Sequence, residues 1–191
     1  MNLEKHSEHL IGKAHVGNQQ AINELFSLWY ERVYNMAWKY FGEEEVAMDV
    51  CQQTFVTVHR KLHHLEDASK FKYWLYRTVI NQCHMESRKR KTLHQAQEKF
   101  IQRQFQPVQE QPDEIYHRTE RSKVVLAALQ QLPEEQRTII LMKEYEDLTF
   151  REIAETLGIS EGTAKSRLYY GLKNLRNILL NNRITKEYNY E

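Results

Sequence analysis

The stretch REIAETLGISEGTAKSRL, residues Arg151–Leu168, decides the fold of the C-terminal part of the chain. Its apolar residues follow a helical spacing that stops at Gly158, a residue suited to ending a helix in the left-handed conformation. A second helical pattern starts directly after Ser160, a favourable N-cap. Thr149 and Glu152 have the spacing of a capping box for the first helix. Two helices joined by so short a turn are typical of a helix-turn-helix motif.

The second helix of this motif carries hydroxyl and cationic side chains on its first turns. Side chains of this kind are suited to contacting base edges and phosphates in the major groove of DNA. We therefore predict that this helix binds duplex DNA. The residues assigned to that contact are Glu161, Gly162, Thr163, Lys165, Ser166, Arg167 and Tyr170.

The remainder of the chain also has helical periodicity, with no alternating strand pattern and no internal repeat. The segment from Lys91 to about Gln111 is rich in Gln and ends near Pro107 and Pro112, a composition that suits a linker or a poorly anchored helix. We predict an all-α chain of two small helical domains joined by a flexible linker. The predicted boundaries are residues 1–91 for the first domain, 92–117 for the linker and 118–191 for the helix-turn-helix domain.

Charge is segregated along the chain, although the formal net charge is only +1. The segment Ser69–Lys91 contains seven Lys or Arg residues and one acidic residue. The segment Glu110–Glu161 contains twelve acidic and six basic residues, and the chain is basic again from Gly162 onward. Two basic segments on either side of an acidic one indicate two contacts with a polyanion.

The basic segment Ser69–Lys91 has the pattern of an amphipathic helix. Its predicted inward face consists of Phe71, Trp74, Leu75, Thr78, Gln82 and Met85. The opposite face combines aromatic and basic side chains, which suits stacking on unpaired bases beside phosphate contacts. We assign single-stranded DNA binding to Tyr73, Tyr76, Arg77, Asn81, His84, Arg88 and Lys91, with Ile80 on the same face.

Several classes of protein are excluded by what the sequence lacks. No apolar run is long enough to cross a bilayer, and the N-terminal residues lack the apolar stretch of a signal peptide, so we expect a cytoplasmic protein without membrane insertion. Cys51 and Cys83 lie near apolar faces and are predicted to be core residues rather than a disulfide framework. His59 and His63 have a ligand-like spacing, but no Glu follows His59 as a zinc hydrolase helix requires. With no nucleophile elbow or phosphate-binding glycine loop, we expect no enzyme activity, no metal and no cofactor.

Taken in order, these segments resemble an extracytoplasmic-function sigma factor, a two-domain specificity subunit of bacterial RNA polymerase. AMDVCQQTFVTVHRKL (Ala47–Leu62) resembles the helix that binds core polymerase, and Asp49, Gln52 and Phe55 match its acidic, amide and aromatic positions. FKYWLYRTVINQC (Phe71–Cys83) resembles the helix that recognises the −10 promoter element. The stretch LQQLPEEQRTIILMKEYEDLTFREIAETLGISEGTAKSRL is similar to the domain that binds the −35 element.

The resemblance implies a sigma factor that binds core RNA polymerase and promoter DNA and directs transcription initiation. His59 stands where the family usually has an aromatic residue and Met85 where it usually has Asp, which leaves the fine specificity of the first domain open. Whether an anti-sigma factor is a further partner also stays open. The alternative is a LuxR-like transcriptional regulator, whose helix-turn-helix would fit the second motif alone.

Overall fold

The computed structural model describes residues 3–101 and 120–188, and all regular secondary structure in these two ranges is helical. The predicted all-α class is therefore confirmed. The N-terminal half contains α1 (Leu3–His15), α2 (Gln19–Phe41), α3 (Glu44–Lys61), η1 (Leu62–His64), η2 (Ala68–Lys70) and α4 (Phe71–Ile101). The C-terminal half contains α5 (Glu120–Gln130), α6 (Glu134–Ile140), a π-helical turn η3 (Leu141–Tyr145), α7 (Phe150–Leu157) and α8 (Glu161–Tyr188).

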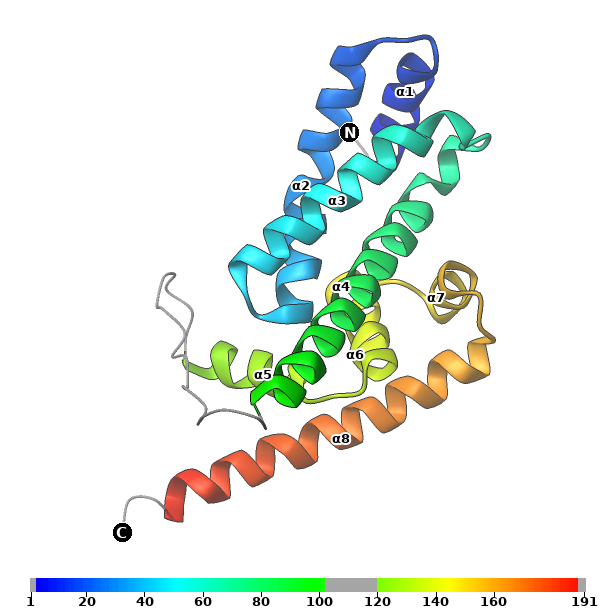
Figure 1. The fold of residues 1–191 in the computed structure, drawn as a ribbon. Helices are drawn as coiled ribbons and strands as arrows, with labels where there is room; N and C mark the ends of the chain where they lie inside the picture. Colours follow the sequence, from blue (N-terminus) through cyan, green and yellow to red (C-terminus); the bar gives the residue numbers. More distant parts are fainter. Residues whose placement is uncertain (1–2, 102–119, 189–191) are drawn as a thin grey trace.

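Local signals define the ends of α2. The side chain of Asn18 accepts a hydrogen bond from the backbone amide of Ala21 at 3.1 Å, as expected of an N-cap. Gly42 ends the helix in the left-handed conformation, with φ of 74°. These two residues set the length of α2 and return the chain sharply into α3, so that α2 and α3 pack as neighbours (Figure 1).

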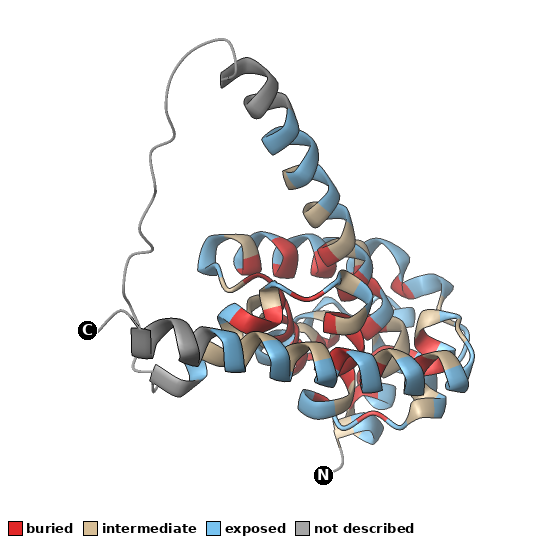
Figure 2. Cartoon of the chain, turned by 90° about the horizontal axis from the view of Figure 1, so that it is seen from below, coloured by how far each residue is buried: buried red, intermediate tan, exposed pale blue. Residues whose placement is uncertain are grey.

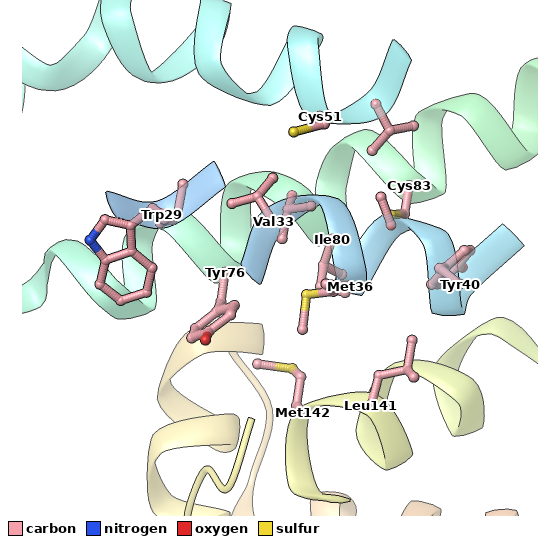
Figure 3. Close-up of a cluster of buried hydrophobic side chains, with 14 of the residues drawn as sticks. Trp29, Val33, Met36, Tyr40, Cys51, Tyr76, Ile80, Cys83, Leu141 and Met142 are labelled. Carbon is pink, nitrogen blue, oxygen red and sulfur yellow. The ribbon is translucent and has the colours of Figure 1, made fainter. Parts of the chain in front are cut away.

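The two halves are packed against each other, and α4 runs between them (Figure 1). Buried residues gather in the interior of the helical body (Figure 2), and they come from both halves. Figure 3 shows Leu141 and Met142 of η3 pointing toward Met36 and Tyr40 of α2 and Ile80 of α4. All five side chains belong to one continuous hydrophobic core. The arrangement of two helical units is as predicted, and in this structure their apolar surfaces are merged.

The predicted linker starts at residue 92, which lies within α4, since this helix continues to Ile101. Its last described turns stand away from the body of the molecule, where residues 91–95 are exposed (Figure 2). The sequence between Lys91 and Ile101 has good helix formers, and the preceding turns are anchored in the core, so the helix propagates past the point where its apolar residues become sparse. The rest of the predicted linker, residues 102–117, lies within the range 102–119 that the structure does not describe. Within the described ranges, no helix is long and apolar enough to cross a membrane.

Candidate nucleic-acid and polymerase interfaces

The helix-turn-helix motif has the local structure that the sequence predicted. Thr149 and Glu152 form the capping box of α7, with the amide of Glu152 donating to Thr149 Oγ1 at 3.3 Å and the amide of Thr149 donating to Glu152 Oε2 at 2.7 Å. Gly158 ends α7 with φ of 68°. Ser160 Oγ accepts from the amide of Thr163 at 3.0 Å and so caps α8. The turn is fixed by hydrogen bonds at both ends, which sets the direction in which α8 leaves it.

The first turns of α8 are open to solvent on the predicted DNA-binding side. Glu161, Gly162, Lys165, Ser166 and Tyr170 are exposed, and Thr163 and Arg167 are partly buried. The structure thus brings all seven residues of the predicted −35 contact to one end of one helix.

Two cations in this group are already engaged in weak ion pairs. Lys165 Nζ lies 3.8 Å from Glu161 Oε2, one helical turn earlier. Arg167 Nη2 lies 3.8 Å from Glu135 Oε1 on α6. Partly exposed pairs at such distances contribute little stability, so both cations remain available to a phosphate or a base.

The predicted DNA-binding face of α4 is only partly accessible. Arg77, Asn81, Arg88 and Lys91 are exposed. Tyr76 is fully buried and Ile80 is almost fully buried, so the prediction that these two residues face outward is wrong. Tyr73 and His84 are partly buried. The prediction that Met85 faces inward is also wrong, since 60% of it is exposed.

These corrections share one physical cause. The periodicity analysis assumed that α4 has a single buried face, but α4 packs against α2 and α3 on one side and against α7 and η3 of the C-terminal half on another. The buried face of α4 is therefore wider than the predicted inward face, and it is centred on a different side of the helix. Its members are Phe71, Leu75, Tyr76, Thr78, Val79, Ile80 and Cys83, whereas Trp74 and Gln82 are only partly buried.

Hydrogen bonds join the covered face of α4 to acidic residues of the C-terminal half. Tyr76 donates its hydroxyl hydrogen to Glu146 Oε2, and burial together with this carboxylate raises the pKa of Tyr76. Tyr73 donates to Glu152 Oε1 at 2.6 Å, a hydrogen bond that with partial burial raises the pKa of Tyr73 to about 12. Both phenols therefore stay protonated and act as donors at neutral pH.

Two further contacts lie nearer the C-terminal end of α4. Lys91 Nζ lies 2.5 Å from Glu134 Oε1, and Ser87 Oγ donates to the same oxygen at 2.8 Å. Burial alone would raise the pKa of Glu134, but these two partners outweigh it and lower that pKa. His84 lies 3.3 Å from Thr138 Oγ1, and burial lowers the pKa of its imidazole, which favours the neutral ring.

The predicted polymerase-binding surface on α3 is exposed in part. Asp49 and Gln52 are exposed, whereas Phe55 is buried beneath Phe26 and Tyr30, with ring centroids 4.8 and 6.3 Å away. Phe55 was predicted as a contact residue, and in this structure only 9% of it is exposed. Burial of an aromatic ring against other rings is favourable, which accounts for the inward position of Phe55.

Two apolar residues of this surface were missed by the sequence analysis. Met48 and Val56 of α3 are 51% and 44% exposed and lie on the same side of the helix as Asp49 and Gln52. Exposed apolar side chains grouped with polar ones are typical of protein-binding surfaces. The available signal was that neither residue falls on the buried stripe of Ala47, Val50, Cys51, Thr54 and Val58.

Within the described ranges, no group of three His, Cys, Asp or Glu side chains could hold a metal ion. Cys51 and Cys83 are both buried and unpaired, as the sequence predicted for core residues.

Two family models match the chain. One described as "Sigma-70 region 2" matches residues 25–92, and one described as "Sigma-70, region 4" matches residues 122–175. The first match runs from α2 into α4 and includes the predicted polymerase and −10 surfaces, and the second includes the helix-turn-helix.

Curated relatives carry related names. The chain is 32% identical over 168 residues to "ECF RNA polymerase sigma factor SigE" of Mycolicibacterium smegmatis, a match that spans 85% of this chain and 64% of that relative. It is 25% identical to "ECF RNA polymerase sigma factor SigW" of Bacillus subtilis, over 84% of this chain and 89% of the relative. It is 26% identical to "RNA polymerase sigma-H factor" of Pseudomonas aeruginosa, over 88% of this chain and 91% of the relative.

Two solved structures share the fold. The sigma factor RpoE in complex with the anti-sigma factor NepR from Bartonella quintana aligns with a TM-score of 0.66 and 22% identity, covering 82% of this chain and 95% of that one. CnrH in complex with the cytosolic domain of CnrY aligns with a TM-score of 0.65 and 21% identity, covering 91% and 97%.

Proposed function

The chain belongs to the extracytoplasmic-function sigma factors, and we propose that it binds core RNA polymerase and directs promoter-specific transcription initiation by reading −35 and −10 elements. The observation that carries this proposal is the capped helix-turn-helix at Thr149–Leu168, in which the first turns of α8 are exposed to solvent. The region 2 match in the N-terminal half precedes it in the chain. The function is one of binding rather than catalysis, and it takes place in the cytoplasm.

For the −35 element, we propose that α8 enters the major groove with the seven residues of its first turns. Arg167 is suited to a bidentate contact with guanine, and Lys165 to a phosphate. Glu161, Gly162, Thr163, Ser166 and Tyr170 complete the contact surface.

For the −10 element, we propose that α4 and the preceding segment with η1 and η2 hold unstacked bases of the opened strand. Arg77, Asn81 and Arg88 are exposed for this contact, and Lys91 is exposed but paired with Glu134. Tyr73 and His84 contribute when the C-terminal half moves away. Tyr76 lies in the shared core and is fully buried, so it can contact DNA only after such a movement.

For core polymerase, we propose that the α3 surface formed by Met48, Asp49, Gln52 and Val56 docks on the largest subunit of the enzyme. Two structural relatives are described in complexes, one with the anti-sigma factor NepR and one with CnrY. By analogy we propose an anti-sigma factor as a further class of partner for this chain. The proposed units are residues 1–91 and 118–191.

The LuxR-like alternative is not favoured. A sigma-70 region 2 match covers residues 25–92, and no strand of a receiver domain occurs in the described ranges. A direct test is size-exclusion chromatography of the purified chain mixed with core polymerase. The proposal expects the two to elute together with one copy of the chain per core enzyme. Separate elution at micromolar concentrations of both would contradict it.

A further inference from the structure

The N-terminal helix α1 lies outside both family matches, the first of which begins at residue 25. It packs against α2 and also against η1 and η2, the two short helices between α3 and α4 (Figure 1). The segment Leu62–Lys70 contains η1 and η2, and it belongs to the part of the chain for which we propose contact with unstacked bases. We call this segment the −10 loop. A helix outside the matched regions therefore contacts the candidate site for the opened strand.

One side of α1 is anchored in the core of the N-terminal half. Leu10 and Ile11 of α1 are buried there. Trp29 of α2 donates its indole hydrogen to Ser7 Oγ of α1 at 2.9 Å, and both residues are buried. Separating the two helices would leave this buried donor and acceptor without partners, which is costly. We therefore treat α1 and α2 as one rigid unit.

The C-terminal end of α1 is bonded to the start of the −10 loop. His15 is the last residue of α1, and its Nε2 lies 3.1 Å from the backbone oxygen of Leu62. A carbonyl oxygen can only accept a hydrogen bond, so the imidazole is the donor. The same oxygen accepts from the amide of Leu65 at 3.0 Å, the hydrogen bond that closes η1. His15 therefore holds the atom at which α3 ends and the −10 loop begins.

The N-terminal end of α1 is bonded just beyond the other end of the −10 loop. Lys72, in the first turn of α4, donates to Glu4 Oε1 at 3.0 Å. The two ends of one helix thus hold the chain on both sides of the loop. Between these anchors, most of the loop is open to solvent, and its exposed residues are His63, His64, Glu66, Asp67, Ser69 and Lys70.

We propose that α1 is a brace that holds the −10 loop in the conformation that receives unstacked bases, with His15 and Glu4 as positioning residues. The inference rests on the proposed function. A loop that is ordered before the strand arrives loses less conformational entropy on binding than a mobile loop does. The brace therefore raises the affinity for the opened strand without a contact between α1 and DNA.

The first test is amide hydrogen exchange in the free full-length chain. His15→Ala removes the donor to Leu62, and we expect peptides that cover residues 62–70 to exchange about two- to tenfold faster, as for the loss of one hydrogen bond. Exchange in α8 should not change. His15→Gln should restore the slow exchange, because its side-chain amide can donate in place of Nε2. The matched control is His9→Ala, at an exposed histidine of the same helix, which should exchange like the unmodified chain.

The second test measures DNA binding by the holoenzyme. Two probes come from one genomic fragment that supports run-off transcription: the single non-template strand across the −10 element, and the duplex across the −35 element. We expect His15→Ala to bind the single strand about two- to tenfold more weakly and the −35 duplex equally well. His15→Gln and His9→Ala should bind both probes like the unmodified chain.

Unchanged exchange of residues 62–70 or unchanged single-strand affinity in His15→Ala would overturn the proposal. An equal loss for both probes would also overturn it, since that pattern indicates general destabilisation. So would a His15→Gln variant that behaves like His15→Ala, because the hydrogen bond would then not be the cause.

If circular dichroism shows that His15→Ala does not fold, Glu4→Gln provides the same tests at the other anchor. Glu4 is exposed, and Gln removes the charge that attracts Lys72. Failure of the proposed function gives a different result. In that case no fragment supports transcription and the two probes cannot be chosen, whereas hydrogen exchange in the free chain still reports whether α1 holds the −10 loop.

Discussion

Arg77 of α4 and Arg167 of α8 line the same cavity, although one belongs to the surface proposed for the −10 element and the other to the surface proposed for the −35 element. Arg167 Nη2 also lies 3.8 Å from Glu135 Oε1 of α6, which lines the same cavity. The same packing that completes the hydrophobic core therefore brings two candidate DNA-binding surfaces face to face. The predictions below separate the contribution of each surface.

Reversing the charge at Asp49 should abolish binding to core polymerase. Asp49 is exposed beside Gln52, and Arg at this position would place a cation in the proposed docking surface. We expect Asp49→Arg to fail to co-purify with core enzyme while its circular dichroism spectrum stays unchanged. Glu8→Arg, an equal change at an exposed residue of α1, is the control and should co-purify normally. Normal co-purification of both variants would show that α3 is not the docking helix.

The two cations at the start of α8 should have different roles. A bidentate Arg–guanine contact is worth ~1–3 kcal/mol of discrimination, whereas a phosphate-bound Lys adds affinity without sequence preference. We expect Arg167→Ala to relax preference at particular −35 positions. Lys165→Ala should weaken all sequences alike and reduce the salt slope by about one unit.

Titration of the full-length holoenzyme against a library of −35 sequences at two salt concentrations measures both effects. If Lys165→Ala relaxes the sequence preference and Arg167→Ala weakens all sequences alike, the base contact belongs to Lys165 and the phosphate contact to Arg167. If neither substitution alters affinity or preference, α8 does not read DNA.

Loss of Arg77 should slow strand opening more than initial promoter binding. Contacts with unpaired bases form only in the opened state, and stacking is worth ~1–3 kcal/mol per base. We expect Arg77→Ala in the holoenzyme to reduce permanganate reactivity of −10 thymines with little change in closed-complex affinity. Lys89→Ala, an exposed cation of α4 outside the proposed surface, is the matched control. Equal footprints for the two variants would show that Arg77 has no specific role in strand opening.

Both cysteines should resist thiol reagents in the folded chain. Burial raises the pKa of Cys51 to about 11 and also raises that of Cys83. Since the thiolate is the reactive species, labelling at pH 8 should be more than about a hundredfold slower than in denaturant. Mass spectrometry of chains labelled over time distinguishes the two sites. Fast labelling of either cysteine in the native chain would refute its assignment to a closed core.

The features predicted well from sequence are those fixed by near neighbours in the chain. The capping box of Thr149 and Glu152, the left-handed Gly158 and the cap Ser160 each depend on residues within a few positions, and all are present in the structure. The helix-turn-helix could therefore be placed to the residue.

The features predicted poorly depend on contacts between distant parts of the chain. Tyr76 and Ile80 of α4 lie in the shared core, which also contains Leu141 and Met142 of the other half (Figure 3). Helical periodicity records which side of a helix is apolar, but a helix packed on two sides has no single apolar face. Met48 and Val56 were missed although they fall outside the buried stripe of α3, because the prediction for that helix used only the positions that match the family.

The most direct test of the proposed function is run-off transcription with core RNA polymerase on genomic promoter fragments, with and without this protein. The account predicts discrete transcripts from a subset of fragments that appear only when the chain is added. It also predicts that Asp49→Arg removes those transcripts. Transcription that is the same with and without the chain, on every fragment and with a chain shown to be folded, would contradict the assignment as a sigma factor.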